Sequence, residues 1–270
     1  MNRKKKLGLI AGSGQIPLIV CHRAKQYGYT CVAAGIKKEF DKKLKDQADL
    51  IKSYEVKDFI KVLAFFKKNN VNKIIFAGKI KHETIYSKEA LGSPLSSLFE
   101  NTKSKNPDEI VRAVFDYVEM QGIEVMDSSG FLFDLFCESG VLTRKPVSLK
   151  VKEEIEFGWP LAKKTADLEI GQTVVIKDKG VVAVEGMEGT DKTIERGGHI
   201  AGKDCVVIKV ARTHQDIRID QPTVGLNTVK SLINARCSAL CIEAEKVLFL
   251  DKEKALNLAE KNRISIIARK

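Results

Sequence analysis

The stretch LGLIAGSGQIPLIVCHRAKQYGYTCVAAG, residues Leu7–Gly35, decides the fold of the first half of the chain. Its apolar run Leu7–Ala11 predicts a buried strand, and the glycine turn that follows ends at a proline suited to the first position of a helix. Gly28 is typical of a helix end, and Thr30–Gly35 predicts a second strand. A strand, a helix and a second strand in this order indicate parallel strands, as in a Rossmann-like sheet.

The turn itself is a candidate substrate site, made of Gly12, Ser13, Gly14 and Gln15. Backbone N–H groups at the start of a helix attract anions, so the turn suits a phosphate or ribosyl group. The dinucleotide-binding fingerprint is incomplete, because Pro17 replaces its third glycine and no acidic residue ends the second strand. NAD is therefore not the predicted ligand, and a tight turn that binds nothing is the competing interpretation.

The same alternation continues to residue 139. Apolar residues at helical spacing predict a helix over Val56–Asn69, and KIIFA predicts a strand over Lys73–Ala77. A capping asparagine and a first-turn proline predict a helix over Asn106–Gln121, followed by a strand at Ile123–Asp127. Residues 1–139 are therefore predicted to form a Rossmann-like domain with a mostly parallel sheet. Such sheets bind ligands beside the carboxyl ends of their strands, which adds three substrate-binding candidates: Ala77, Gly78 and Lys79.

Residues 140–270 predict a second, mixed α/β domain, entered through Gly140–Pro146. A charged helical pattern over Lys150–Leu168 is predicted to break at Gly158-Trp159-Pro160, since glycine and proline disfavour a helix interior. Strands at Thr173–Lys177 and Val181–Glu185, joined by Asp178-Lys179-Gly180, predict a hairpin. Further strands are predicted at residues 204–210, 239–242, 247–250 and 264–268, and helices at 224–236 and 251–262.

The loop GMEGTD directly after the hairpin gathers polar residues and glycines. Its Glu188 and Asp191 are candidate metal ligands, and its substrate-binding candidates are Gly189, Thr190 and Asp191. Lys209, near the end of the next strand, suits a phosphate oxygen. The competing interpretation is that Thr190 or Asp191 only caps the helix that follows.

The segment QDIRIDQPTVG, Gln215–Gly225, carries the densest polar pattern. Read as a strand, Gln215–Asp220 turns its two isoleucines into a core and lines the other face with Asp216, Arg218 and Asp220. The two carboxylates suit a hard cation such as Mg²⁺, and the arginine suits a phosphate. A solvated strand face with a surface ion pair is the competing interpretation.

A formal net charge of +11 and a pI near 9.2 favour an acidic partner: nucleic acid, an anionic membrane surface or a phosphorylated substrate. Aromatic residues make up only 7% of the chain, which disfavours stacking platforms for nucleic acid. The six cysteines form no C-x-x-C pair and are predicted to be buried, reduced thiols of a cytosolic protein. No apolar run is long enough to span a bilayer, so a soluble or peripheral protein is expected.

Four motifs in this order carry a family resemblance. They are IAGSGQIP at Ile10–Pro17, FAGKI at Phe76–Ile80, DLEIGQTVVIKDKGVVAVEGMEGTD at Asp167–Asp191 and KVARTHQDIRIDQPTVG at Lys209–Gly225. The chain resembles the LpxI-type UDP-2,3-diacylglucosamine pyrophosphatases of lipid A biosynthesis over nearly its whole length. The two C-terminal motifs are long and specific, whereas the glycine turn alone would identify nothing.

The resemblance implies hydrolysis of UDP-2,3-diacylglucosamine to UMP and 2,3-diacylglucosamine 1-phosphate, with Mg²⁺ assisting water attack on the α-phosphorus. Mn²⁺ is a second cation of suitable chemistry. The resemblance also implies a homodimer and a lipid substrate enclosed between two domains. The essential aspartate of the family stands in a D-x-P-T-x-G context, which is Asp220 here.

Site roles follow from that resemblance and from the residue types. Asp220 is the catalytic candidate, as Mg²⁺ ligand or general base, and Asp191, Asp216 and Glu188 are candidate further ligands. Gln215 joins the substrate-binding candidates named above. The positive charge suits a cytoplasmic protein on the inner-membrane surface. The alternative function is a non-catalytic basic nucleic-acid-binding protein, although no nucleic-acid-binding module is recognisable and none is the predicted partner.

Overall fold

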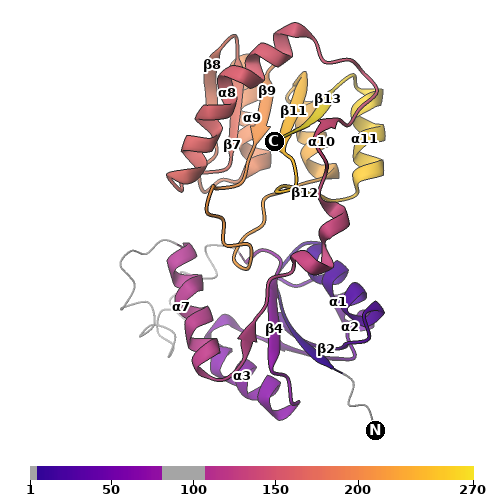
Figure 1. Ribbon diagram of the computed structural model, residues 1–270, viewed down its shortest axis with the longest axis vertical. Helices are drawn as coiled ribbons and strands as arrows, with labels where there is room; N and C mark the ends of the chain where they lie inside the picture. The colour runs from indigo at the N-terminus through magenta and orange to yellow at the C-terminus, as the bar shows by residue number, and fades with distance from the viewer. Residues whose placement is uncertain (1–4, 81–106) are drawn as a thin grey trace. The chain divides into compact units, whose positions relative to one another are not determined.

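The computed structural model describes residues 5–80 and 107–270, so the expected helix start at Asn106 lies outside the described residues. The chain forms two compact units, each with its own sheet (Figure 1). The first unit comprises Met1–Leu132 together with Ile217–Ile219, and the second comprises Phe133–Asp216 and Asp220–Lys270. No sequence pattern predicts that Ile217–Ile219 belong to the first unit.

The first unit contains an all-parallel sheet of five strands. In spatial order these are β3 (Leu50–Tyr54), β2 (Thr30–Ile36), β1 (Lys6–Ala11), β4 (Lys73–Ala77) and β5 (Glu124–Val125). Its helices are α1 (Ile16–Gln26), α2 (Leu44–Gln47), α3 (Phe59–Lys68) and α7 (Pro107–Met120). Figure 1 shows α1 and α2 on one side of this sheet and α3 and α7 on the other, which confirms the predicted Rossmann-like arrangement.

Alternating side chains explain why this sheet is covered on both faces. Ile10, Val32 and Ala34 are buried in one core cluster with Phe66 of α3 and Phe115 of α7. A helix was predicted from residue 56, but residues 56–58 form a separate 3₁₀ turn before α3. Phe59 and Leu63 of the predicted apolar stripe lie in the core, whereas Ile60, at the same helical spacing, is 41% exposed.

The second unit contains a six-stranded mixed sheet, as predicted. In spatial order its strands are β6 (Gly140–Val141), β13 (Ser265–Arg269), β11 (Ala239–Glu243), β9 (Val206–Lys209), β7 (Thr173–Lys177) and β8 (Gly180–Val184). Strands β13, β11 and β9 are parallel, whereas β6, β7 and β8 pair antiparallel to their neighbours. A small parallel pair joins β10 (Thr223–Val224) to β12 (Leu248–Phe249).

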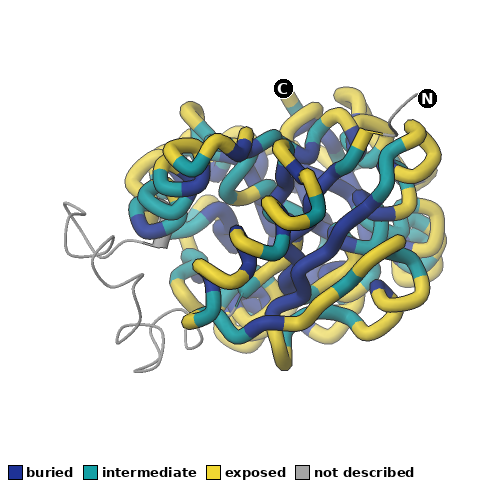
Figure 2. Tube along the Cα trace, turned by 90° about the horizontal axis from the view of Figure 1, so that it is seen from below, coloured by how far each residue is buried: buried dark blue, intermediate teal, exposed yellow. Residues whose placement is uncertain are grey.

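Four helices cover the two faces of this sheet: α8 (Leu149–Asp167), α9 (Thr190–Ala201), α10 (Leu226–Asn234) and α11 (Lys252–Lys261). Val174 and Ile176 of β7 face α8, while Val175 between them belongs to the core shared with α9, α10 and α11. The twofold alternation of a strand therefore supplies both cores. Figure 2 shows buried positions running along the strands and exposed positions on the outer turns of the helices.

The predicted break in α8 is wrong, because the helix is continuous with Pro160 inside it. Gly158 is buried, and a β-carbon there would lie 2.6 Å from side-chain atoms of both Ile176 and Ile208. The glycine therefore allows the helix to approach the sheet closely. Packing against two strands outweighs the low helix propensity of this sequence.

The hairpin between β7 and β8 is confirmed. Asp178 and Lys179 adopt φ values of 50° and 56°, the left-handed conformations that a two-residue type I′ turn requires. The carboxylate of Glu154 on α8 accepts hydrogen bonds from both backbone N–H groups, at 2.7 Å and 3.0 Å. This buried side chain therefore fixes the turn from beneath.

The predicted strand over Gln215–Asp220 is wrong, because this segment consists of turns and irregular backbone. Ile217 is 42% exposed instead of buried. Ile219 does pack against a core, but against the core of the first unit. An alternation of apolar and polar residues over only six positions does not distinguish a strand from a loop in which each side chain has a different partner.

All six cysteines are buried and free, as predicted. Cys205 and Cys237 lie close together, with 3.2 Å between their sulfur atoms. Across the described residues, no helix combines the length and apolar character needed to cross a bilayer.

Candidate active site

The glycine turn after β1 and the end of β4 lie side by side, as their shared position at the carboxyl edge of the sheet predicts. Ser13 and Lys79 exchange backbone hydrogen bonds of 2.8 Å and 2.9 Å, and Gly12 donates its N–H to the Ala77 carbonyl. These N–H groups are thus occupied by the protein's own backbone. A β-carbon at Gly12 would lie 2.6 Å from the Lys79 carbonyl oxygen, so glycine is required by this close approach.

A second group of predicted residues meets where β9 ends. Lys209 is only 6% exposed, and its ammonium group donates a hydrogen bond of 2.5 Å to the hydroxyl of Thr190, the first residue of α9. The Thr190 hydroxyl in turn donates to Glu185 at 3.0 Å, and the hydroxyl of buried Thr173 lies 3.5 Å away. The helix cap is Gly189 and makes no side-chain capping bond, so the prediction that Thr190 or Asp191 caps α9 is wrong.

Asp220 is exposed at the end of the irregular loop. The side-chain amide nitrogen of Gln172 lies 3.4 Å from its Oδ2 and 3.3 Å from the amide oxygen of Gln215. Gln215 donates its own amide N–H to the backbone carbonyl of Asp220 at 2.9 Å. Two amides therefore contact the aspartate, one at its carboxylate and one at its backbone.

These two groups are joined by consecutive residues of the chain. Gln172 contacts Asp220, and Thr173 contacts Thr190. Thr173 also pairs in register with Lys209, and the carbonyl of Gln172 accepts the N–H of Val210 at 2.9 Å. The start of β7 and the end of β9 thus hold a lysine, a helix N-terminus and an aspartate at one edge of the second sheet.

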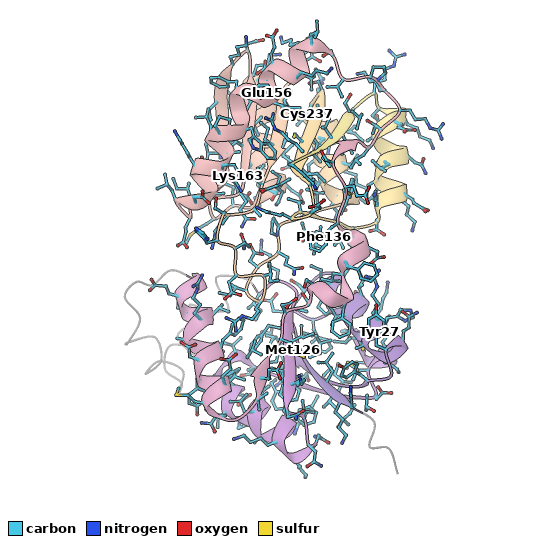
Figure 3. The ribbon with its side chains drawn as sticks, in the orientation of Figure 1. Tyr27, Met126, Phe136, Glu156, Lys163 and Cys237 are labelled. Carbon is cyan, nitrogen blue, oxygen red and sulfur yellow. The ribbon has the colours of Figure 1, made fainter. Side chains whose placement is uncertain are left out.

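The loop between β9 and Asp220 is held by two further carboxylates. Glu243 accepts the N–H of Ala211 at 2.9 Å, and Lys163 donates to the carbonyl of the same residue at 2.7 Å. Asp167 accepts both the N–H and the hydroxyl of Thr213, at 2.6 Å and 2.8 Å. The backbone N–H of Thr213 holds the pKa of Asp167 below its usual value, so this carboxylate stays ionised. Figure 3 labels Lys163 near the C-terminal end of α8.

Two side chains near this edge bury polar atoms that have no hydrogen-bond partner in the described part of the chain. They are Oε2 of Glu185 and both amide atoms of Gln221, the neighbour of Asp220. Buried polar groups are nearly always satisfied by protein, water or ligand. Their position beside Thr190 and Asp220 is that expected of a site for a polar ligand.

The predicted metal ligands do not form a cluster of their own. In the described parts of the chain, no three His, Cys, Asp or Glu side chains lie close enough together to hold an ion. Glu188 is committed elsewhere: it accepts from Arg196 at 2.5 Å and from the N–H of Gly186 at 3.1 Å, and the Arg196 guanidinium lowers its pKa. Asp191 is exposed on the first turn of α9.

Asp216 and Asp220 are linked through their backbones, at 3.4 Å. Mg²⁺ in proteins usually takes one or two carboxylates and completes its shell with substrate phosphates and water. The residues present therefore fit an ion shared with a phosphorylated substrate, with Asp220 as its protein ligand, and do not fit an ion held by protein alone.

Arg218 belongs to the first unit. Its guanidinium lies 5.3 Å from the ring centre of Phe115 and 3.3 Å from Glu119. Arg218 is therefore assigned to a different unit from Asp216 and Asp220. The predicted alternation with Asp216 and Asp220 on one strand face is wrong for the same reason as the strand itself.

Sequence reasoning overlooked Gln172, Thr173 and Glu185. The sequence does mark them as polar residues at the ends of the hairpin: Gln172 and Thr173 stand where β7 begins, and Glu185 follows β8. All three lie in one of the motifs that carry the family resemblance. Recognising them requires the pairing of β7 with β9, which links residues far apart in the sequence.

The chain has a parallel α/β unit followed by a mixed α/β unit. In the second unit, Gln172 and Thr173 link an exposed aspartate to a buried lysine and a helix N-terminus, an arrangement suited to a phosphorylated ligand. Residues 6–135 match the LpxI N-terminal domain, and residues 138–267 match the LpxI C-terminal domain. Together these matches span nearly the whole chain, and the chain belongs to the LpxI family.

The UDP-2,3-diacylglucosamine pyrophosphatase LpxI of Caulobacter vibrioides is 24% identical over 268 residues, which cover 95% of this chain and 94% of that protein. Solved structures are much less similar. A UDP-glucose-4-epimerase from Stenotrophomonas maltophila has a TM-score of 0.30 at 13% identity, and covers 54% of this chain and 40% of its own. A GalE-like L-threonine dehydrogenase from Cupriavidus necator has a TM-score of 0.31 at 9% identity, covering 94% and 88%. TM-scores this low establish neither a shared fold nor a shared activity.

Proposed function

We propose that this protein hydrolyses the pyrophosphate bond of UDP-2,3-diacylglucosamine in lipid A biosynthesis. Water attacks the α-phosphorus, the bond from that phosphorus to the bridging oxygen breaks, and the bridging oxygen leaves with the β-phosphate. The products are UMP and 2,3-diacylglucosamine 1-phosphate. Family membership and the near full-length similarity to the Caulobacter pyrophosphatase support this substrate.

The observation that carries the proposal is the environment of Lys209. Its ammonium group is buried, and among the described residues it forms no ion pair with a carboxylate. The Glu185 carboxylate shares the Thr190 hydroxyl but does not pair directly with this ammonium. A buried charge without a direct ion-pair partner favours an anionic ligand beside it. The hydroxyl of Thr190 and the N-terminus of α9 lie beside it, and both favour phosphate oxygens.

Asp220 supplies the carboxylate on which hydrolysis depends, as a ligand of Mg²⁺ or as the base that takes a proton from water. Both roles require an ionised, oriented carboxylate. When bound, Mg²⁺ or Mn²⁺ neutralises charge on the pyrophosphate. Lys209 and Thr190 bind phosphate oxygens, and Gly189 and Asp191 flank Thr190 in the chain.

The glycine turn of Gly12–Gln15 and the end of β4 are proposed to contact the uridine or sugar. Association as a homodimer and docking on the cytoplasmic side of the inner membrane stay predictions from the family resemblance. The basic nucleic-acid-binding alternative rests on net charge alone, whereas family membership favours the hydrolase.

The test is to incubate purified protein with UDP-2,3-diacylglucosamine and Mg²⁺ in ¹⁸O-water and to locate the label by mass spectrometry. Label in UMP is expected. Label in the sugar phosphate would keep the substrate but overturn attack at the α-phosphorus. No turnover with Mg²⁺ or Mn²⁺ would overturn the hydrolase.

Asp220→Asn is expected to lower kcat by at least about 100-fold, because both proposed roles need the negative charge. Asp178→Asn is a matched control: it makes the same chemical change in a left-handed turn position that asparagine tolerates well. Wild-type activity in Asp220→Asn would remove that residue from the mechanism.

A further inference from the structure

We propose that Gln172 is a positioning residue that orients the carboxylate of Asp220. The inference rests on the proposed function, since it assigns a role in that reaction. Gln172 is only 8% exposed and stands immediately before β7. Its side-chain amide nitrogen lies 3.4 Å from Oδ2 of Asp220, at the long end of hydrogen-bond distances. Bonds between catalytic groups are often long before the substrate binds.

The same amide also reaches the aspartate by a second route. Gln172 donates to the side-chain oxygen of Gln215 at 3.3 Å, and that oxygen also accepts the N–H of Arg212 at 3.1 Å. Gln215 then donates to the backbone carbonyl of Asp220 at 2.9 Å. Gln172 therefore influences both the carboxylate and the backbone that carries it.

Gln172 itself sits on rigid backbone. Its carbonyl accepts the N–H of Val210 where β9 ends, at 2.9 Å. The residue before it, Gly171, packs so closely that a β-carbon there would lie 2.1 Å from the carbonyl oxygen of Glu185. An irregular loop carries Asp220, so a donor on the sheet gives the carboxylate a fixed reference point.

The chemistry explains why a glutamine suits this position. Its N–H stabilises the ionised carboxylate, and it adds no charge that would compete for a cation or an anion. A glutamate of the same size would place a second negative charge beside Asp220 and favour its protonated form. A methionine of similar size would keep the packing but remove the donor.

The experiment compares Gln172→Glu and Gln172→Met with wild type, measuring kcat and KM for UDP-2,3-diacylglucosamine with Mg²⁺ over pH 5 to 9. For Gln172→Met we expect kcat to fall roughly 10- to 100-fold with KM changed little, because a misplaced carboxylate affects the reaction more than binding. For Gln172→Glu, which keeps the length of the side chain but replaces the donor by an acceptor, we expect a fall in kcat of the same order with KM again changed little.

A purely structural glutamine would not lower kcat while leaving KM unchanged, so wild-type kcat in Gln172→Glu would overturn the inference. Wild-type kcat in Gln172→Met would do the same. If either variant unfolds, Gln172→Asn replaces it in the experiment. The shorter asparagine amide cannot reach Asp220, so wild-type kcat in Gln172→Asn would also overturn the proposal. Gln26→Glu, on the exposed face of α1, controls for the added charge. Failure of wild type to hydrolyse the substrate would overturn the proposed function itself, a result distinguishable from these.

Discussion

Lys163 and Glu243 form an ion pair inside the second unit, with 3.0 Å between the ammonium nitrogen and the nearer carboxylate oxygen. Each of the two also binds the backbone of Ala211, Lys163 at the carbonyl and Glu243 at the N–H. The pair therefore fixes the second residue of the loop that leads from β9 to Asp220. Its Glu243 member is only 7% exposed at the side chain.

Glu243→Ala is expected to lower the free energy of unfolding by about 3 kcal/mol, because it leaves a half-buried ammonium without its counter-charge and a buried N–H without a partner. Chemical denaturation monitored by circular dichroism measures the change. Glu156→Gln, which breaks an exposed pair with Arg269, is the control and should unfold close to wild type. Equal effects in the two variants would contradict the assigned role of Glu243.

Gly158→Ala is expected to destabilise the protein by about 1–3 kcal/mol, although alanine is the better helix former. The added methyl group would overlap Ile176 and Ile208, which are both fully buried. Lys152→Ala, at an exposed position of the same helix, should unfold like wild type. A stabilised Gly158→Ala would mean that α8 can move away from the sheet at little cost.

Alkylation by a thiol reagent such as iodoacetamide should be slow in the native protein and should reach all six cysteines in guanidinium. Burial raises the pKa of Cys241 to about 12 and also raises the pKa of Cys137, so thiolate is scarce at neutral pH. Mass spectrometry counts the modified thiols. Rapid native labelling of Cys241 would contradict its burial.

Asp167→Asn should show a pH-dependent loss of stability. The folded-state pKa of Asp167 lies below its unfolded value of about 3.9, so its contribution is fully present above that pH. The contribution is lost as the pH falls through the lower folded pKa. Urea midpoints of variant and wild type should therefore differ most above about pH 4 and converge in stronger acid. A difference that grows on acidification would contradict this sign.

Chelation of divalent cations with EDTA should abolish turnover without changing the thermal unfolding midpoint. The described acidic side chains form no cage of their own, so the ion is expected to be shared with substrate and not to stabilise the fold. Activity should return on adding Mg²⁺. A lower unfolding midpoint after chelation would instead indicate a structural ion.

The regular elements could be predicted because their signals are local. The run before Gly12, the hairpin at Asp178 and Lys179, and the apolar stripe of α3 each need only a few neighbouring residues to be recognised. The continuity of α8 could not be predicted, since the partners of Gly158 lie on two strands far along the chain.

The site was predictable in its residue types and not in its geometry. Lys209, Thr190 and Asp220 were identified individually, but only the pairing of β7 with β9 relates them. Alternation in Gln215–Asp220 suggested a strand, whereas individual side-chain bonds hold this segment as a loop. The pattern over Gln215–Asp220 shows which side chains are polar, but it does not predict what they contact.

Ile217–Ile219 belong to the first unit although Phe133–Asp216, a segment of the second unit, separates them from the rest of it. This assignment affects any protein made by recombining this chain with a relative. A chimera that joins residues 1–132 of this chain to the remainder of a relative would bring in a foreign tripeptide to pack against the resident Phe115 core. Mutations in these three residues and in that core are therefore expected to accumulate together.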